Sequence, residues 1–151
     1  MLRWRWQGEA LALSREMNDT PGEAIGLLVL GIAKMQGGEL ERAGALVGEG
    51  LALLRELGLE RDLAECLEVM AEVVGGLGEE RRAARLWGAA GALREATDNP
   101  WVLFERRLHE PYLAAARSRM EESEWSEAWQ EGWVMTPDEA VSYALAGEAS
   151  G

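Results

Sequence analysis

Cysteine, histidine and long apolar runs are all scarce in this chain of 151 residues. The one cysteine, Cys66, excludes an internal disulfide and indicates a reducing, cytoplasmic compartment. No apolar run approaches the roughly 20 residues that cross a bilayer, and no signal-peptide core follows the first arginines. The sequence therefore predicts a soluble cytoplasmic protein without a membrane partner.

Positive charge is also in short supply. Lysine and arginine total 15 against 27 aspartates and glutamates, which gives a net charge of -12. Because nucleic acids are polyanions, this balance would repel them, and we expect no direct nucleic-acid partner. With 48% hydrophobic residues, the chain is long enough to bury one core, and its length favours a single domain.

The residues that commonly carry chemistry form no motif. His109, the only histidine, stands beside Leu108 without metal-ligating partners, and we interpret it as a surface or capping residue. Cys66 lies in an apolar helical pattern typical of a small buried hydrophobe. The C-terminal glutamates are interpreted as a solvated helix face: Glu121, Glu122, Glu124, Glu127 and Glu131. We therefore predict a protein that is not an enzyme, with no catalytic residue, no metal and no cofactor.

An internal repeat dominates the first two thirds of the chain. The stretch at positions 8–17 reads GEALALSREM, and the stretch at 48–57 reads GEGLALLREL, forty residues later with seven of ten letters identical. The repeat extends beyond these ten residues, since Leu27 matches Leu67 at the same shift of forty residues. A repeat of this length is typical of helical-repeat proteins.

Each repeat unit has the pattern of two helices joined by a glycine turn. In the first unit, residues 22–37 have helical apolar spacing, the glycine pair at 37–38 interrupts it, and residues 39–58 resume it until Gly58. The second unit repeats this plan from residue 61 to residue 100.

Small residues recur where two helices of a unit would cross. Gly31 and Ala43 stand twelve residues apart, as do Ala71 and Ala83. This pattern resembles the tetratricopeptide repeat family in a longer form of about forty residues, over about residues 3–98. The resemblance implies an all-α, right-handed stack of antiparallel helical hairpins, an α-solenoid. We expect about seven helices, the last of them split, at 3–18, 23–36, 40–57, 62–76, 80–97, 101–121, 123–132 and 137–146.

The C-terminal part resembles the end of LuxR-type and related multidomain bacterial transcriptional regulators. The residues that carry this likeness are Ala128, Trp129, Glu131, Gly132, Thr136, Glu139, Ala140, Tyr143 and Ala144. Thr136 and Glu139 also have the spacing of a capping box, with Pro137 at the first helical position. We expect repeats over residues 1–98, with the first one incomplete, and a helical cap over 99–151 packed on them, all in one domain.

In the repeat family, the first helix of each unit lines a concave groove. Helix 23–36 is apolar nearly all round, which implies that both its faces are covered. The C-terminal helices or a preceding repeat could cover the second face, or else a partner or ligand could bind there. The equivalent positions one unit later form an acidic stripe. We predict that the groove and partner-binding residues are Ile25, Leu28, Ile32, Met35, Glu65, Glu68 and Glu72.

A second candidate surface is a row of tryptophans. Trp125, Trp129 and Trp133 are spaced four apart, so that they share one face of a helix. Such a stripe favours a core position, and the alternative is an interface, because tryptophan is enriched in binding hot spots.

Residues 3–18 match only the second helix of a unit, and they leave Leu11 without a partner helix. We expect a fragment of a longer protein, or a truncated product, that self-associates through this incomplete repeat, for example as a homodimer. The predicted function is a non-catalytic protein–protein interaction module, a scaffold or sensor fragment of a bacterial regulator. The alternative is a small-ligand sensor domain with its ligand in the concave groove.

Overall fold

The computed structural model describes residues 2–146, with side chains from Gly8 onward. Within this range the chain forms eight α-helices and no strand, which confirms the predicted all-α class. The expected split at the C-terminal end is present as two separate helices. The helices are α1 (Leu2–Glu16), α2 (Thr20–Gln36), α3 (Leu40–Leu57), α4 (Glu60–Gly76), α5 (Glu80–Ala96), α6 (Leu103–Ser118), α7 (Glu122–Trp133) and α8 (Pro137–Leu145).

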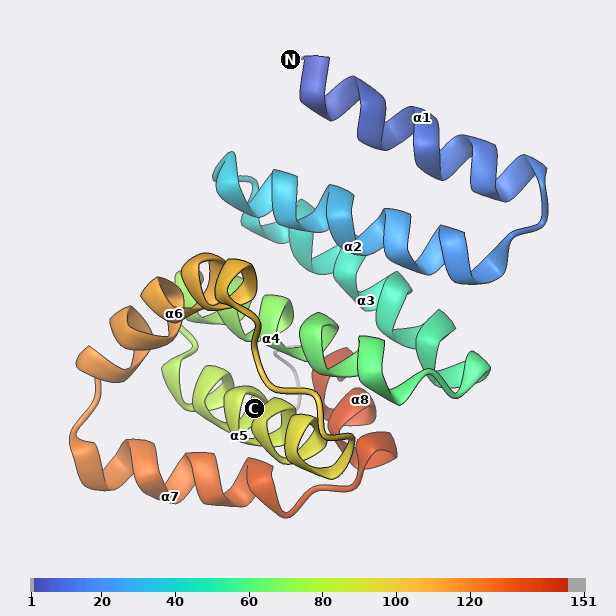
Figure 1. Cartoon of the computed structure of the whole chain (residues 1–151). Helices are drawn as coiled ribbons and strands as arrows, with labels where there is room; N and C mark the ends of the chain where they lie inside the picture. Colours follow the sequence, from blue (N-terminus) through green and yellow to red (C-terminus); the bar gives the residue numbers. More distant parts are fainter. Residues whose placement is uncertain (1, 147–151) are drawn as a thin grey trace.

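The first five helices run back and forth, and each packs against the next (Figure 1). The last three helices return to this array. α7 packs along α5, α6 lies on α4 and α5, and α8 contacts α3, α4 and α5. The right-handed stack and the division of the chain at residue 98 remain predictions.

The turns between the first helices recur every twenty residues. The backbone is left-handed at Asn18, Gly38, Gly58, Gly78 and Asp98, with φ between 48° and 89°. At each turn the next residue's N–H donates to the carbonyl five residues back, as Glu39 does to Lys34 at 3.0 Å. Glycine adopts this conformation without cost, and asparagine and aspartate tolerate it. The forty-residue sequence repeat therefore consists of two helix-and-turn units of equal length.

Small residues allow the paired helices to approach closely. A Cβ atom on Gly31 would lie 2.6 Å from a methyl group of Val47 and 3.5 Å from the carbonyl of Ala43. Ala43, Ala71 and Ala83 are fully buried. The predicted close approach of Gly31 and Ala43 is therefore confirmed.

The contact between α5 and α7 is closer still, because it joins two backbones. A Cβ atom on Gly132 would lie 1.7 Å from the carbonyl oxygen of Arg85, and one on Gly88 would lie 2.0 Å from that of Trp129. No residue with a side chain fits at either position without a shift of the backbone. These two glycines therefore fix α7 against α5.

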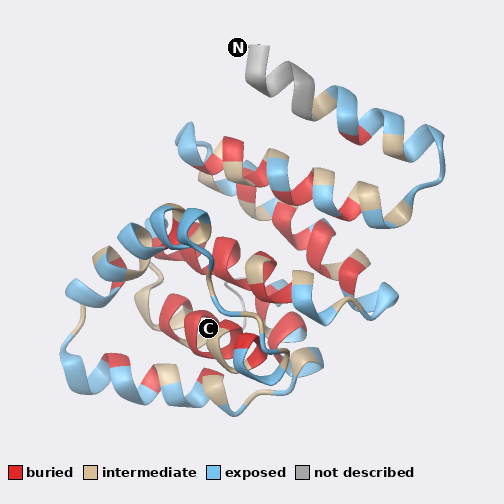
Figure 2. Cartoon of the chain, viewed as in Figure 1, coloured by how far each residue is buried: buried red, intermediate tan, exposed pale blue. Residues whose placement is uncertain are grey.

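Burial is concentrated in α4 and α5 (Figure 2). Every residue of α4 from Leu63 to Gly75 is buried except Glu65, which is half-buried. A carboxylate on such a helix loses its hydration and requires partners within the protein. This requirement determines the position of α6.

At the N-terminal end, Leu11 is buried against Gly26 of α2, so its side chain has a neighbour within the chain. Leu13 and Met17, on the same helix, remain exposed. The expected self-association through α1 stays a prediction. None of the helices described in the structure is long and apolar enough to cross a membrane.

The close approach of α2 and α3 can be tested with Gly31→Leu. The added side chain would overpack the crossing, and we expect a loss of roughly 1–3 kcal/mol or more in the free energy of unfolding. Gly8→Leu is the matched control, because a Cβ atom there meets nothing within 4 Å. Since leucine favours helix more than glycine does, the control should be neutral or stabilising. Urea midpoints measure both effects. Equal midpoint changes for the two variants would contradict the close approach of α2 and α3 at Gly31.

Candidate functional site

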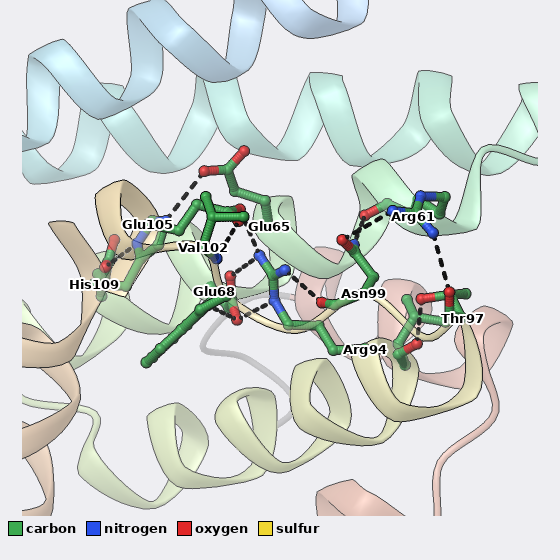
Figure 3. A network of polar contacts seen from close by, with 12 residues as sticks. Arg61, Glu65, Glu68, Arg94, Thr97, Asn99, Val102, Glu105 and His109 are labelled. Carbon is green, nitrogen blue, oxygen red and sulfur yellow. Dashed lines mark hydrogen bonds and ion pairs between the residues drawn. The ribbon is translucent and has the colours of Figure 1, made fainter. Parts of the chain in front are cut away.

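Three glutamates of α4 form a largely buried network with residues of α5, of α6 and of the segment between them (Figure 3). Glu65, Glu68 and Glu72 occupy one face of α4, which α6 covers. We call the following residues the α4–α6 network: Glu65, Glu68, Glu72, Arg94, Trp101, Glu105 and His109.

The centre of the network is the pair formed by Glu68 and Arg94. The Arg94 guanidinium donates from Nε to Oε2 of Glu68 at 2.7 Å and from Nη2 to Oε1 at 2.8 Å. Glu68 is only 2% exposed, and Trp101 Nε1 donates to its Oε2 at 2.8 Å. A bidentate contact of this kind is among the strongest hydrogen-bonded pairs in proteins.

Arg94 also connects α5 to the segment that leads into α6. It donates to Oε2 of Glu105 at 3.0 Å and to the carbonyl of Asn99 at 2.9 Å. Burial opposes its charge, but the hydrogen bonds and negative charges of Glu68 and Glu105 raise the pKa of Arg94. Burial raises the pKa of Glu68, and the contact with Arg94 acts in the opposite direction. The bidentate geometry is that of an ion pair.

The other half of the network surrounds His109, which is fully buried. Its Nδ1 lies 2.7 Å from Oε1 of Glu72, and its Nε2 lies 3.1 Å from Oε2 of Glu65. Two carboxylates can both accept from this ring only if both nitrogens carry protons, so the geometry fits an imidazolium. The ring also stacks on Trp101, with 5.9 Å between the ring centroids.

The pKa values of this half follow from burial and charge. Burial would lower the pKa of His109, but the hydrogen bonds that it donates to Glu65 and Glu72 and the charges of Glu72 and Glu68 raise it to about 10. Burial raises the pKa of Glu72 to about 7, against the effect of His109. The second carboxylate oxygen of Glu72 is buried and has no hydrogen-bond partner.

Two sequence-based interpretations are corrected by this geometry. His109 was expected at the surface or as a cap, and this expectation is wrong, because α6 folds back onto α4 and buries the ring. Glu68 and Glu72 were expected on an open groove wall, but both are buried beneath α6, and Glu65 is half-buried. The face of α4 that was expected to bind a partner is covered by the chain itself.

The predicted groove residues of α2 have different surroundings. Leu28 and Met35 are buried, Ile32 is half-buried, and Ile25 is 40% exposed. Met35 lines a small cavity together with Tyr112 and other residues of α6. The sequence left open whether the C-terminal helices, a preceding repeat or a partner covers this face of α2. At the end of α2 that carries Met35, the C-terminal helix α6 lies beside it.

The tryptophan row of α7 faces α5. Trp125 is buried, whereas Trp129 and Trp133 are half-buried and stack on each other with 4.8 Å between ring centroids. Gly91 of α5 faces these two rings, since a Cβ atom on it would lie 3.3 Å from the Trp133 ring and 3.5 Å from the Trp129 ring. This placement is that of packing side chains, and a role for them in an interface remains untested.

Cys66 and the α8 cap agree with the sequence analysis. Cys66 is fully buried, and burial raises the pKa of its thiol far above the ordinary range. Glu139 N–H donates to the Thr136 hydroxyl at 3.1 Å, and Thr136 N–H donates to the Glu139 carboxylate at 2.9 Å. The predicted capping box is therefore confirmed, with Pro137 as the first residue of α8.

Among the described residues, two of the open surfaces outside the network are large. One is a cavity of about 720 Å³ near the start of α5, lined by four arginines and four glutamates among other residues. The other is a largely apolar groove of about 580 Å³ bordered by α3, α4, the start of α5 and the end of α8. We call this second surface the α3 groove. The residues that line it include Leu40, Glu41, Gly44, Ala45, Gly48, Glu49, Ala52, Met70, Val73, Val74, Leu77, Glu79, Arg82, Ala144 and Leu145.

The network can be tested through the pH dependence of stability. The pKa of His109 is raised by folding, so its stabilisation is complete below about pH 6.5 and is lost as the pH rises through about 10. We expect the free energy of unfolding to fall by on the order of 2 kcal/mol or more over this window, and His109→Gln should remove that part of the slope. Urea midpoints from about pH 7.5 to about pH 10 measure this slope, above the range in which Glu72 titrates.

Arg107→Gln is the matched control for this test, because Arg107 is an exposed cation on the same helix. Cys66, whose thiol pKa burial raises, adds the same slope to all three proteins, so their difference isolates His109. Parallel pH profiles for the wild type and His109→Gln would contradict a buried imidazolium.

Comparison with known proteins links the chain to bacterial regulators. No protein-family model matches it, and no solved structure matches it. It is similar to proteins named "Putative HTH-type transcriptional regulator" from Mycobacterium bovis and from Mycobacterium tuberculosis, each 29% identical over 146 residues. The match covers 93% of this chain but 17% of each relative, so the chain spans about a sixth of their length. The chain is thus a helical protein similar to one part of these transcriptional regulators.

Proposed function

We propose that this chain is a non-catalytic helical-repeat module of a cytoplasmic bacterial regulatory protein, and that it binds a protein segment. Its similarity to one part of much longer transcriptional regulators supports the regulatory role. The tetratricopeptide-like repeat supports the interaction role, because stacked helical repeats present extended surfaces for binding.

The observation that carries the proposal is the α3 groove. It combines a largely apolar lining with a wide opening to solvent, and four helices border it, α3, α4, α5 and α8. Contiguous exposed apolar surface is uncommon on monomeric proteins, and where it occurs it often marks a protein-interaction site. A helix laid into such a groove is a common mode of recognition.

A small-ligand sensor is less well supported by the geometry. The face of α4 that was predicted to line a ligand groove is covered by α6, and the cavities against that helix and against α8 have volumes of about 140 and 150 Å³. Pockets for small molecules commonly measure about 300–1,000 Å³ and enclose most of the ligand. The larger cavity near α5 is open, and its arginines are balanced by glutamates.

Self-association is a weaker form of the same proposal. It was expected because the first repeat is incomplete, but the Leu11 side chain is already buried against α2. The net charge of -12 also opposes a contact between two copies. We therefore favour a different protein segment as the partner.

Two titrations test this function. In a metabolite screen followed by intrinsic tryptophan fluorescence and thermal unfolding, the module should show no saturable response, because the cavities against α6 and α8 are small and the two larger ones are open to solvent. Helical segments taken from the rest of the Mycobacterium tuberculosis relative should include at least one that binds with a Kd of about 100 µM or lower. A metabolite that saturates the fluorescence change, with no segment binding, would favour the sensor.

A further inference from the structure

We propose that the α3 groove binds an amphipathic helix that carries lysine or arginine along its flanks. This inference rests on the proposed function, and it names the surface and the chemistry of the partner. It departs from the sequence-based expectation, which placed the binding site on α2 and on the Glu65, Glu68 and Glu72 face of α4, because the α3 groove is lined by α3 and by other residues of α4.

The α3 side of the groove includes four small residues. Gly44, Ala45, Gly48 and Ala52 all line it. A Cβ atom on Gly44 would lie 3.5 Å from Val73, and one on Gly48 would lie 3.4 Å from Leu145, so that neither glycine is already packed as tightly as Gly31. Small residues at a helix surface allow another backbone to approach closely.

The size of the groove suits a short helix. The lining on α3 extends from Leu40 to Ala52, which corresponds to about 18 Å of helix at about 1.5 Å per residue. This length would hold about three turns of a second helix. The apolar residues Leu77 of the α4–α5 turn and Leu145 of α8 both line the groove and are each 39% exposed, so their burial could drive binding.

The packing of α8 shows that the surface beside the groove accepts a helix. α8 contacts α3, α4 and α5 through small apolar residues, with Ala140, Val141 and Ala144 buried. Arg82 donates to the carbonyl of Ala144 at 2.8 Å and so fixes the end of α8 at the margin of the groove. The α3 groove therefore continues a helix-binding surface that is already in use.

The charges around the groove determine the chemistry of the partner. Three carboxylates line it, Glu41, Glu49 and Glu79, against one guanidinium, that of Arg82. Arg82 already pairs with Glu79, and Glu49 has only a long contact of 3.9 Å with Arg15. Within the described part of the chain no cation forms an ion pair with Glu41. A cationic helix would complement these carboxylates, whereas a second copy of this acidic chain would be repelled.

The test uses two model helical peptides of about three to four turns, one with leucine, alanine and lysine and one with glutamate in place of lysine. Binding to the full chain is measured by isothermal titration calorimetry at low and at raised salt. We expect the lysine peptide to bind, the glutamate peptide not to bind, and added salt to weaken the binding.

Three variants locate the site. Ala45→Leu fills the groove from an exposed position and should abolish binding. The double variant Glu41→Lys with Glu49→Lys should weaken binding about 3-fold to 10-fold. Glu56→Lys, an exposed charge reversal on the same helix and outside the groove lining, is the matched control and should bind nearly as the wild type does. Circular dichroism checks that each variant is folded.

The remaining outcomes separate this inference from the proposed function. Equal binding of the lysine peptide to the wild type and to Ala45→Leu would overturn the groove as the site. Binding of the glutamate peptide that Ala45→Leu abolishes would overturn the cationic partner and leave the interaction module standing. Failure of both peptides to bind would overturn the inference, while the proposed function would still be judged by segments of the relative.

Discussion

The structure depends on the compensation of three carboxylates on its most buried helix. Glu65, Glu68 and Glu72 project from α4, where almost every neighbouring residue is excluded from water. An ionised carboxylate without partners in such surroundings would cost several kcal/mol. Arg94 and His109 supply the two positive charges that face these carboxylates, and Trp101 supplies a further hydrogen-bond donor. The placement of α6 follows from this requirement, because His109 belongs to that helix.

The covering of α4 by α6 has a consequence for binding. A tetratricopeptide-like module would offer this face of α4 to a partner. Here α6 of the same chain covers it, and the carboxylates of α4 already accept hydrogen bonds from Arg94 and His109. The groove beside α3 and α8 has the opposite character, since its lining is largely apolar and two of its three carboxylates, Glu41 and Glu49, form no short ion pair within the described residues. The binding surface that we propose is therefore on the α3 side of the helix pairs.

The sequence predicted the helices well because their signals are local. Apolar spacing and glycine turns identify helices and their ends without any knowledge of tertiary contacts, and the capping box of Thr136 and Glu139 involves only neighbouring residues. The close approach at Gly31 could also be predicted, because its twelve-residue spacing from Ala43 matches the small-residue spacing of the tetratricopeptide family. The all-α class followed from these features.

The network could not be predicted in the same way, because its partners are distant in the sequence. His109 meets Glu72 and Glu65 from 37 and 44 residues away, and nothing in the local letters of α6 marks its histidine as buried. One signal was present in the sequence, namely three glutamates at helical spacing on a helix that is otherwise apolar from Leu63 onward. A charged stripe on a buried helix requires partners, but the stripe was expected to be an exposed groove wall. Arg94, Trp101 and Glu105 were missed for the same reason.

Hydrogen exchange of the α6 amides tests most directly whether the network holds α6 against α4. In the wild type, the central amides of α6 should exchange slowly, and Arg94→Gln should accelerate them far more than the amides of α2 and α3. This selectivity is expected because Arg94 contacts Glu68 and Glu105 but no residue of those two helices. Fast exchange of α6 in the wild type, or equal acceleration of all helices in the variant, would contradict the account.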